Sequence, residues 1–245
     1  MEFAIEVTVV IALSMILSIL AFVLRFLTLG GAIASFATGI VVGIFGGFEW
    51  FVLLMLFTIA GFAATKANFV KKKESGLQEG HSGERTHMNV LGVGIPPCIF
   101  AVLAYFVGDE HILIMSIGFV ASIAVAGADT VASELGVKDQ KVWLCTNFKR
   151  VPPGTNGGMS VFGTIMAIAA AFVAAILGWL VLYHTLDNSL IIIPVAAVAG
   201  FIGCYFDSIL GAMVEDRGYI SKYTNNATTG VMGAFVAMGI AYFFV

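Results

Sequence analysis

Long apolar runs separated by polar segments dominate the pattern of this sequence. Eight runs are present, at residues 5–24, 27–47, 49–65, 90–107, 112–128, 159–182, 189–213 and 227–245. A helix that crosses a bilayer needs about 20 mostly apolar residues, so the pattern predicts about eight transmembrane helices. The fifth run is short, and its helix is expected to continue into the polar segment that follows. We therefore expect an all-α, polytopic helical bundle that forms a single transmembrane domain over residues 1–245.

The long polar segments, residues 66–89, 129–158 and 214–226, all fall on the same side of the predicted bundle. If the N-terminus is outside, all 12 Lys and Arg residues lie in inner segments, whereas the outer segments around Glu49 and Asp187 contain none. Cytoplasmic loops of membrane proteins carry an excess of Lys and Arg. The charge pattern therefore predicts that both termini lie outside, that the three segments are cytoplasmic loops and that the protein spans the cell membrane.

The composition agrees with a membrane location. The chain is 60% hydrophobic and only 11% charged, whereas soluble domains are about 25% charged. Its three cysteines and four histidines are scattered without the spacing of a metal site, which argues against a centre built from these residues. The net charge of −3 gives no reason to expect a nucleic-acid partner. The N-terminus lacks the positive region of a signal peptide, so we expect it to form a mature first helix.

Small residues recur at every fourth position of the second apolar run. They are Gly31, Ser35, Gly39, Gly43 and Gly47. On a helix this spacing makes one nearly flat face, against which another backbone can pack closely. Packing inside the bundle is one interpretation, and a homodimer seam is the other.

Two carboxylates end the fifth apolar run, in the stretch GADTVASELG at residues 127–136. Acidic side chains at a membrane edge are costly and usually have a function, although a hydrated helix end is the plainer interpretation. Mg²⁺ binds one or two carboxylates together with phosphate oxygens and water, so Asp129 and Glu134 are candidate ligands, with Ser133 beside them. On a regular helix these two acids point roughly 140° apart, so a shared ion would require a helix break near Ser133.

A basic, glycine-rich stretch, KRVPPGTNGG, lies just before the sixth run. Glycines let a ligand approach the backbone closely, and a helix N-terminus favours phosphate. The stretch lacks the spacing of a Walker A motif, and an ordinary Gly-rich helix cap is the alternative. We predict a nucleotide-phosphate site formed by Lys149, Arg150, Pro153, Gly154, Thr155, Asn156, Gly157 and Gly158.

A further acid, Asp207, lies well inside the predicted membrane edge of the seventh run. The pattern D-S-x-x-G-A at residues 207–212 is similar to D-T-x-x-S-E at residues 129–134, and both helices are predicted to run towards the cytoplasm. A buried lone Asp needs a partner. A faint internal repeat is one interpretation of the similarity, and the other, which we predict, is that Asp207 is a second carboxylate facing the same site.

The remaining loops supply candidates for contacts with a substrate phosphate. Segment 66–89 is a solvated basic loop on anionic lipid headgroups in the plainer interpretation, which composition alone favours. In the other interpretation Lys66, Lys72, Arg85 and Asn89 bind phosphate. In segment 214–226, Asn225 and Asn226 are predicted to cap the eighth helix, and Asn225 is also a candidate ligand.

The stretches GADTVASELG and KRVPPGTNGGMSVFGT resemble the integral membrane family that includes the phytyl-phosphate kinase of plant vitamin E salvage. ERTHMNVLGVG, FDSILGAMVED and NNATTG are similar to other landmarks of that family, and the resemblance runs from about residue 30 to the C-terminus. It implies a kinase that converts an isoprenyl monophosphate, phytyl or geranylgeranyl, to the diphosphate, with CTP or UTP as donor. More distantly, the arrangement is similar to CTP-dependent polyprenol kinases and CDP-alcohol cytidylyltransferases.

Carried over by motif, the resemblance assigns roles to individual residues. Asp129, Glu134 and Asp207 would hold Mg²⁺, and Asp129, Asp207 and Lys149 would be the catalytic residues. Arg85 and Asn89 would contact the acceptor or donor phosphate, and Lys66, Lys72, Ser133 and Asn225 complete the predicted acceptor-phosphate set. The implied partners are an isoprenyl phosphate lipid, a nucleoside triphosphate and membrane lipid, with the active site on the cytoplasmic side.

Two alternatives stay open at the level of sequence. A cytidylyltransferase or polyprenol kinase that makes an activated lipid would use the same donor, and the former would attack the α rather than the γ phosphorus. A small transporter or flippase would also contain membrane carboxylates and Gly-rich helices. Against a transporter, the polar residues cluster on one side, whereas a transport path needs access from both sides.

Overall fold

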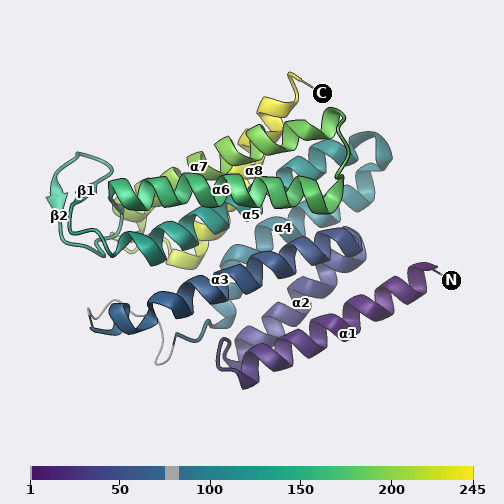
Figure 1. The fold of residues 1–245 in the computed structure, drawn as a ribbon, viewed down its shortest axis with the longest axis horizontal. Coiled ribbons are helices and arrows are strands. Elements are labelled where there is room, and N and C mark those ends of the chain that lie inside the picture. The colour runs from purple at the N-terminus through teal and green to yellow at the C-terminus, as the bar shows by residue number, and fades with distance from the viewer. Residues whose placement is uncertain (1, 75–82, 245) are drawn as a thin grey trace.

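Eight α-helices make up most of the chain that the structure describes (Figure 1). The structure is a computed structural model of residues 2–74 and 83–244, and the side chains of residues 2, 68 and 70–74 are not described. The helices are α1 (Glu2–Val23), α2 (Leu29–Phe45), α3 (Phe48–Glu74), α4 (His87–Val107), α5 (Ile112–Gly136), α6 (Val161–Leu182), α7 (Ile192–Leu210) and α8 (Lys222–Ala241). Each coincides with one predicted apolar run, which confirms the all-α, polytopic bundle. Lys72, a predicted phosphate ligand, lies outside the described side chains.

Six helical segments within the described residues are long and apolar enough to cross a membrane. They correspond to α1 and α3 to α7, so the protein is a multi-pass membrane protein. The other two helices fall short for reasons visible in the sequence. Helix α2 has only 17 residues, at the lower end of the range for a span, and α8 begins with the polar stretch KYTNNATT. The predicted number of about eight spans is thus supported for six of the eight helices.

The connections between helices alternate between the two ends of the bundle. Figure 1 shows both chain termini at one end and the β-strands at the other, which we call the sheet end. The described basic residues belong to the segments at the sheet end, namely Arg25, Lys66, Arg85, Lys138, Lys141, Lys149, Arg150, Arg217 and Lys222. The segregation of charge is therefore a property of the fold, and the assignment of the sheet end to the cytoplasm stays a prediction of the positive-inside rule.

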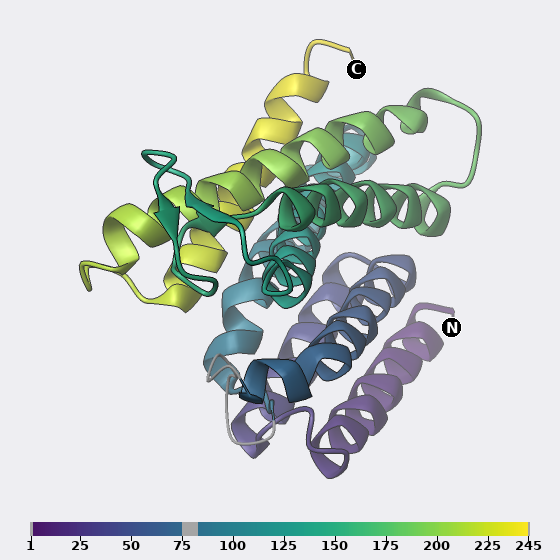
Figure 2. The same cartoon turned by 60° about the vertical axis from the view of Figure 1, so that its left-hand side comes forward.

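Helix α5 lies at the centre of the bundle and packs against α3, α4, α6, α7 and α8. Figure 2 shows α1–α3 grouped on one side of it and α6–α7 on the other. Residues 116–125 of α5 are all buried. Small residues allow this close packing: a Cβ added at Gly200 of α7 would lie 2.7 Å from the Cβ of Ala124. The central position of α5 carries its last turns, and Asp129, into the protein interior.

The small-residue face of α2 packs inside the bundle. A Cβ at Gly39 would lie 2.8 Å from Ser14 Oγ of α1 and 3.3 Å from the ring of Phe51 of α3. Gly43 is covered in the same way by Val10 and Phe51. The internal-packing interpretation is confirmed, and the homodimer seam predicted for this face is wrong at these two glycines because α1 already occupies it.

A small antiparallel sheet, absent from the sequence-based expectation, follows α5. Its strands are β1 (Val142–Leu144), β2 (Arg150–Val151) and β3 (Gly158–Met159), in the order β2-β1-β3. Because β2 and β3 both pair with β1, the glycine-rich loop of residues 152–157 is anchored at each end. Proline lacks an N–H for the ladder, which fits the end of β2 directly before Pro152.

Candidate functional site

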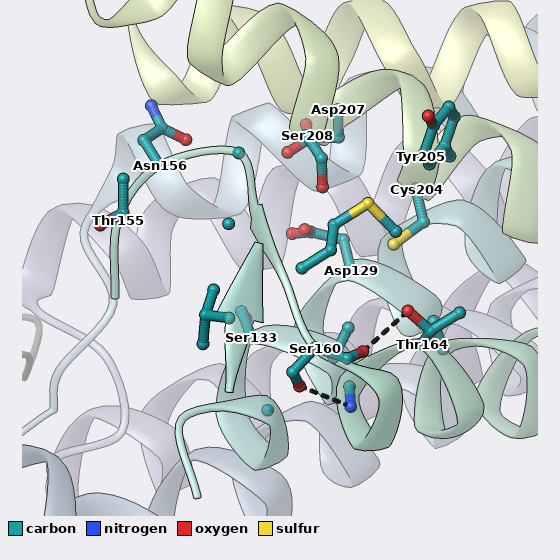
Figure 3. A pocket seen from close by; sticks show the side chains of 18 of the residues that line it. Asp129, Ser133, Thr155, Asn156, Ser160, Thr164, Cys204, Tyr205, Asp207 and Ser208 are labelled. Carbon is teal, nitrogen blue, oxygen red and sulfur yellow. Dashed lines mark hydrogen bonds between the residues drawn. The ribbon is translucent and has the colours of Figure 1, made fainter. Parts of the chain in front are cut away.

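A polar cavity of about 350 Å³ opens at the sheet end, between α5, α6, α7 and the glycine-rich loop. Its polar lining comes from several elements, including Asp129 and Ser133 of α5, Thr164 of α6, Asp207 and Ser208 of α7 and Lys222 of α8. Figure 3 shows the side chains of Asp129, Asp207 and Ser208 directed towards a common space beneath the loop. We refer to this space as the polar cavity.

Two carboxylates from facing helices, Asp129 and Asp207, share the polar cavity. Their charges are close enough to act on one another, as are those of Glu215 and Lys222 on Asp207. Thr229 of α8 donates its hydroxyl hydrogen to Asp207 Oδ1 at 3.2 Å, which supplies the partner that a buried Asp requires. Neighbouring carboxylates repel one another when both are ionised, so this arrangement favours a cation between or beside them.

The donor set fits Mg²⁺ held jointly with a ligand. Among the described residues, no group of three or more His, Cys, Asp and Glu side chains is placed to hold a metal ion. Mg²⁺ commonly binds to one or two protein carboxylates and completes its shell with substrate phosphates and water. Asp129 and Asp207 could supply those carboxylates, with a phosphate ligand in the same cavity.

The glycine-rich loop is fixed against the end of α7. Asn156 donates from Nδ2 to the carbonyl of Gly211 at 3.2 Å and to Asp216 Oδ1 at 3.0 Å. Gly157 has a φ of +71°, and a Cβ there would lie 2.7 Å from the carbonyl oxygen of Ser208. The contacted segment Gly211–Glu215 is a single π-helical turn, a feature common at functional sites.

The same loop forms one wall of the cavity. All five residues from Gly154 to Gly158 line it. The N-terminus of α6 does so too, through Ser160, Gly163 and Thr164. Ser160 is the N-cap and accepts from the N–H of Gly163 at 3.0 Å. Glycine-rich backbone and the positive end of a helix dipole together favour a phosphate ligand. The helix-cap interpretation also holds, with Ser160 rather than a glycine as the cap.

The basic residue that lines the polar cavity is Lys222, and neither of the two predicted basic residues, Lys149 and Arg150, does so. Lys149 and Arg150 are exposed and do not line the polar cavity. The guanidinium of Arg150 instead lies 5.6 Å from the ring centroid of Trp143. Lys222, the first residue of α8, lines the cavity. The sequence signal that could have identified Lys222 is its position directly after Ser221, the residue that caps α8.

The candidate ligands on the last turns of α5 lie on different faces of the helix. Ser133 lines the polar cavity, whereas Glu134 is buried and does not. Helix α5 continues without a break to Gly136, so Asp129 and Glu134 stay on different faces. The structure therefore brings Asp129 together with Asp207, and does not bring Glu134 to the same place.

Asn225 holds α8 against α7. Its amide donates to the carbonyl oxygen of Asp207 at 3.0 Å and to Glu215 Oε2 at 3.2 Å, and its side chain is buried. It does not line the polar cavity. The prediction that Asn225 and Asn226 cap α8 is wrong, because the helix begins a turn earlier and Ser221 accepts from the N–H of Thr224 at 3.1 Å.

The predicted phosphate ligands of segment 66–89 lie elsewhere. Arg85 and Asn89 line a second, mainly apolar cavity of about 360 Å³ between α1, α2, α3 and α4. Arg85 donates from Nη2 to Thr65 Oγ1 at 3.1 Å, and Asn89 Oδ1 accepts from the N–H of Thr86 at 2.9 Å. The ammonium of Lys66 lies 5.2 Å from the ring centroid of Phe26. Arg85 and Asn89 therefore line a different cavity from Asp129, and Lys66 lines neither of the two.

Fold and site together define a polytopic helical membrane protein with a polar, two-carboxylate cavity at one end of the bundle. The chain matches the family model described as integral membrane protein DUF92 over residues 12–242, and it belongs to that family. It is 32% identical over 239 residues to the uncharacterized membrane protein MJ0933 of Methanocaldococcus jannaschii, covering 97% of this chain and 95% of that one.

Two plant proteins are also similar to the chain. The chloroplastic protein VTE6 of Arabidopsis thaliana is 30% identical over 220 residues, which cover 86% of this chain and 64% of that protein. Protein PGR of the same plant is 30% identical over 229 residues, with 86% and 78% covered. No solved structure shows a significant match to the chain.

Proposed function

We propose that the protein is a phosphotransferase that converts an isoprenyl monophosphate, phytyl or geranylgeranyl, to the diphosphate, with CTP or UTP as donor. The observation that carries the proposal is the placement of Asp129 and Asp207 in one cavity with the glycine-rich loop and the N-terminus of α6. The resemblance of the loop and carboxylate motifs to the plant phytyl-phosphate kinase family supports it. The chain's similarity to a chloroplastic plant protein is in keeping with that resemblance.

In this proposal each part of the polar cavity has a separate task. The glycine-rich loop of residues 154–158 and the N-terminus of α6 bind the donor phosphates. Lys222 adds a full positive charge to the same lining. Asp129 and Asp207 hold Mg²⁺, which would neutralise charge on the triphosphate. The sheet end faces the cytoplasm, where nucleotides are available.

The transfer needs no strong base. An oxygen of the acceptor phosphate, already an anion, forms a bond to the γ phosphorus of the donor. The bond from that phosphorus to the bridging oxygen breaks, and the nucleoside diphosphate leaves with the electron pair. Phosphoryl transfer depends mainly on positioning and charge neutralisation, which matches a cavity whose polar lining is carboxylate, lysine, hydroxyl and backbone.

Product analysis with purified protein tests the proposal. Geranylgeranyl phosphate, Mg²⁺ and each nucleoside triphosphate are supplied in turn, and the soluble products are separated. We expect nucleoside diphosphate that accumulates only when the acceptor is present. Pyrophosphate in its place would indicate a cytidylyltransferase. Solute movement into liposomes without nucleotide turnover would favour a transporter and contradict the kinase.

Lys222 should matter more than a lysine of the same end that does not line the cavity. Replacing it with Gln removes a charge from the cavity lining, and we expect kcat/KM for the donor to fall by about tenfold, the loss of one moderate electrostatic contact. Lys138→Gln is the matched control, because Lys138 is exposed at the sheet end and does not line the cavity. Equal effects of the two variants on donor kinetics would contradict a local role for Lys222.

A further inference from the structure

An apolar groove of about 300 Å³ runs along the outside of the bundle beside the polar cavity. Its walls come from β1, the turn after it, and the first two turns of α6, with Tyr205 of α7 at its inner side. Trp143, Leu144 and Phe148 form the wall on the sheet side, and Val161 and Ile165 form the wall on α6. We call it the α6 groove.

The α6 groove adjoins the polar cavity. Four residues line both spaces, Met159, Ser160, Thr164 and Tyr205. Figure 3 shows Ser160 and Thr164 near each other at the start of α6, and Tyr205 beside Cys204 on α7. The side chains of these four residues therefore form the boundary between the groove and the cavity that contains the carboxylates.

The outer rim of the groove is exposed and apolar. Phe148 is 75% exposed, Val161 61% and Ile165 56%. Phe148 also has a φ of +55°, a left-handed conformation that is unusual for a bulky residue. Strained, exposed apolar residues are costly in water, and strain of this kind clusters at functional sites. The cost of exposure disappears where the rim faces lipid, and Val161 and Ile165 belong to a helix apolar enough to span a membrane.

We infer that the α6 groove holds the isoprenoid chain of the acceptor, which enters the polar cavity sideways from the bilayer with its phosphate leading. This inference rests on the proposed phosphotransfer function. Lipid tails are as apolar as the groove, so transfer from bilayer to groove yields little hydrophobic free energy. The groove acts by orienting the chain, while the phosphate supplies the affinity. Ile165 and Tyr205 are then positioning residues for a long acceptor.

The apolar cavity between α1 and α4 is the rival location for the chain. It has a similar volume and a cation, Arg85, in its lining. Its lining shares no residue with that of the polar cavity. A chain held there would place its phosphate beside Arg85 rather than beside Asp129. The lining residues that the α6 groove shares with the polar cavity therefore favour the α6 groove.

Photocrosslinking tests the location directly and does not depend on turnover. A geranylgeranyl phosphate carrying a diazirine on its chain is irradiated with the protein in lipid nanodiscs, and the labelled peptides are mapped. We expect labelling of residues 143–148 and 161–165 that excess unlabelled geranylgeranyl phosphate suppresses. Saturable labelling of α1–α4 instead, or no saturable labelling, would overturn the inference.

A steric variant adds a functional readout. Ile165→Trp fills the groove, and we expect kcat/KM for geranylgeranyl phosphate to fall about tenfold or more, as misplacement of a substrate does. The same variant should leave kcat/KM for dimethylallyl phosphate, whose chain is too short to occupy the groove, within about twofold. Ile168→Trp is the control, since Ile168 is 50% exposed on the same helix and does not line the groove.

The two claims fail in different ways. If wild-type protein labels in the groove but transfers no phosphoryl group, the proposed function is wrong and the lipid site stands. If wild-type protein transfers the phosphoryl group and Ile165→Trp lowers activity equally for long and short acceptors, the groove does not bind the acceptor chain and the inference is wrong.

Discussion

Replacing Asp129 with Asn should lower phosphoryl transfer roughly 100-fold or more, because charge stabilisation at a transferring phosphate is usually the largest catalytic contribution. The substitution keeps the shape of the side chain and removes one carboxylate of the pair, Asp129 and Asp207, that lines the polar cavity. Raised Mg²⁺ concentration should restore part of the activity if the lost group is a metal ligand. Initial rates at several Mg²⁺ concentrations measure both effects.

The matched control is Asp139→Asn. Asp139 lies in the connection that follows α5 and does not line the cavity, and its Oδ1 accepts from the N–H of Lys141 at 2.9 Å, which an asparagine can also do. Its activity should stay within about twofold of wild type, as for surface changes away from special features. Undiminished turnover in Asp129→Asn, with product identity unchanged, would remove Asp129 from the proposed site.

Replacing Gly157 with Ala should also abolish most of the activity, by moving the loop rather than removing a charge. The added Cβ would lie 2.5 Å from the Cβ of Ala212 and 2.7 Å from the carbonyl oxygen of Ser208. The φ of +71° adds backbone strain of about 1–3 kcal/mol for a residue with a side chain. We expect a lower apparent Tm in detergent and at least a roughly tenfold rise in KM for the donor, since 1 Å displacements cost that much or more.

Gly108 provides the control for strain alone. It has a φ of +75°, nothing lies within 4 Å of its added Cβ, and it joins α4 to α5 at the end opposite the sheet. Gly108→Ala should therefore lower Tm while leaving the KM of the folded protein for the donor unchanged. If Gly157→Ala changed Tm but not donor KM, the glycine-rich loop would not be part of the nucleotide site.

The helices were predictable because a bilayer imposes a length and a composition on each span. The eight runs fall on the eight helices, and the sorting of Lys and Arg identified the end that carries the sheet and the polar cavity. Asp207 could be singled out because an acid within an apolar run is costly without a partner. The structure supplies that partner as Thr229 of α8, which the sequence had not indicated.

The details of the site depended on tertiary placement, which local pattern does not encode. Strands of two or three residues, such as β2 and β3, are too short to show a period. Lys149 sits in the most suggestive motif yet faces outward, whereas Lys222 reaches the cavity because α8 packs beside α7. Asp129 and Glu134 are separated because α5 remains helical to Gly136. The spacing in the sequence left open whether the helix breaks near Ser133.

The fate of isotopic label in the donor tests the central claim most directly. CTP labelled at either the γ or the α phosphate is incubated with Mg²⁺, geranylgeranyl phosphate and protein in nanodiscs, and the lipid product is extracted. The proposed phosphotransfer predicts that γ label appears in geranylgeranyl diphosphate and that α label stays in the aqueous phase as CDP. Appearance of α label in the lipid, or of neither label with any nucleoside triphosphate, would contradict it.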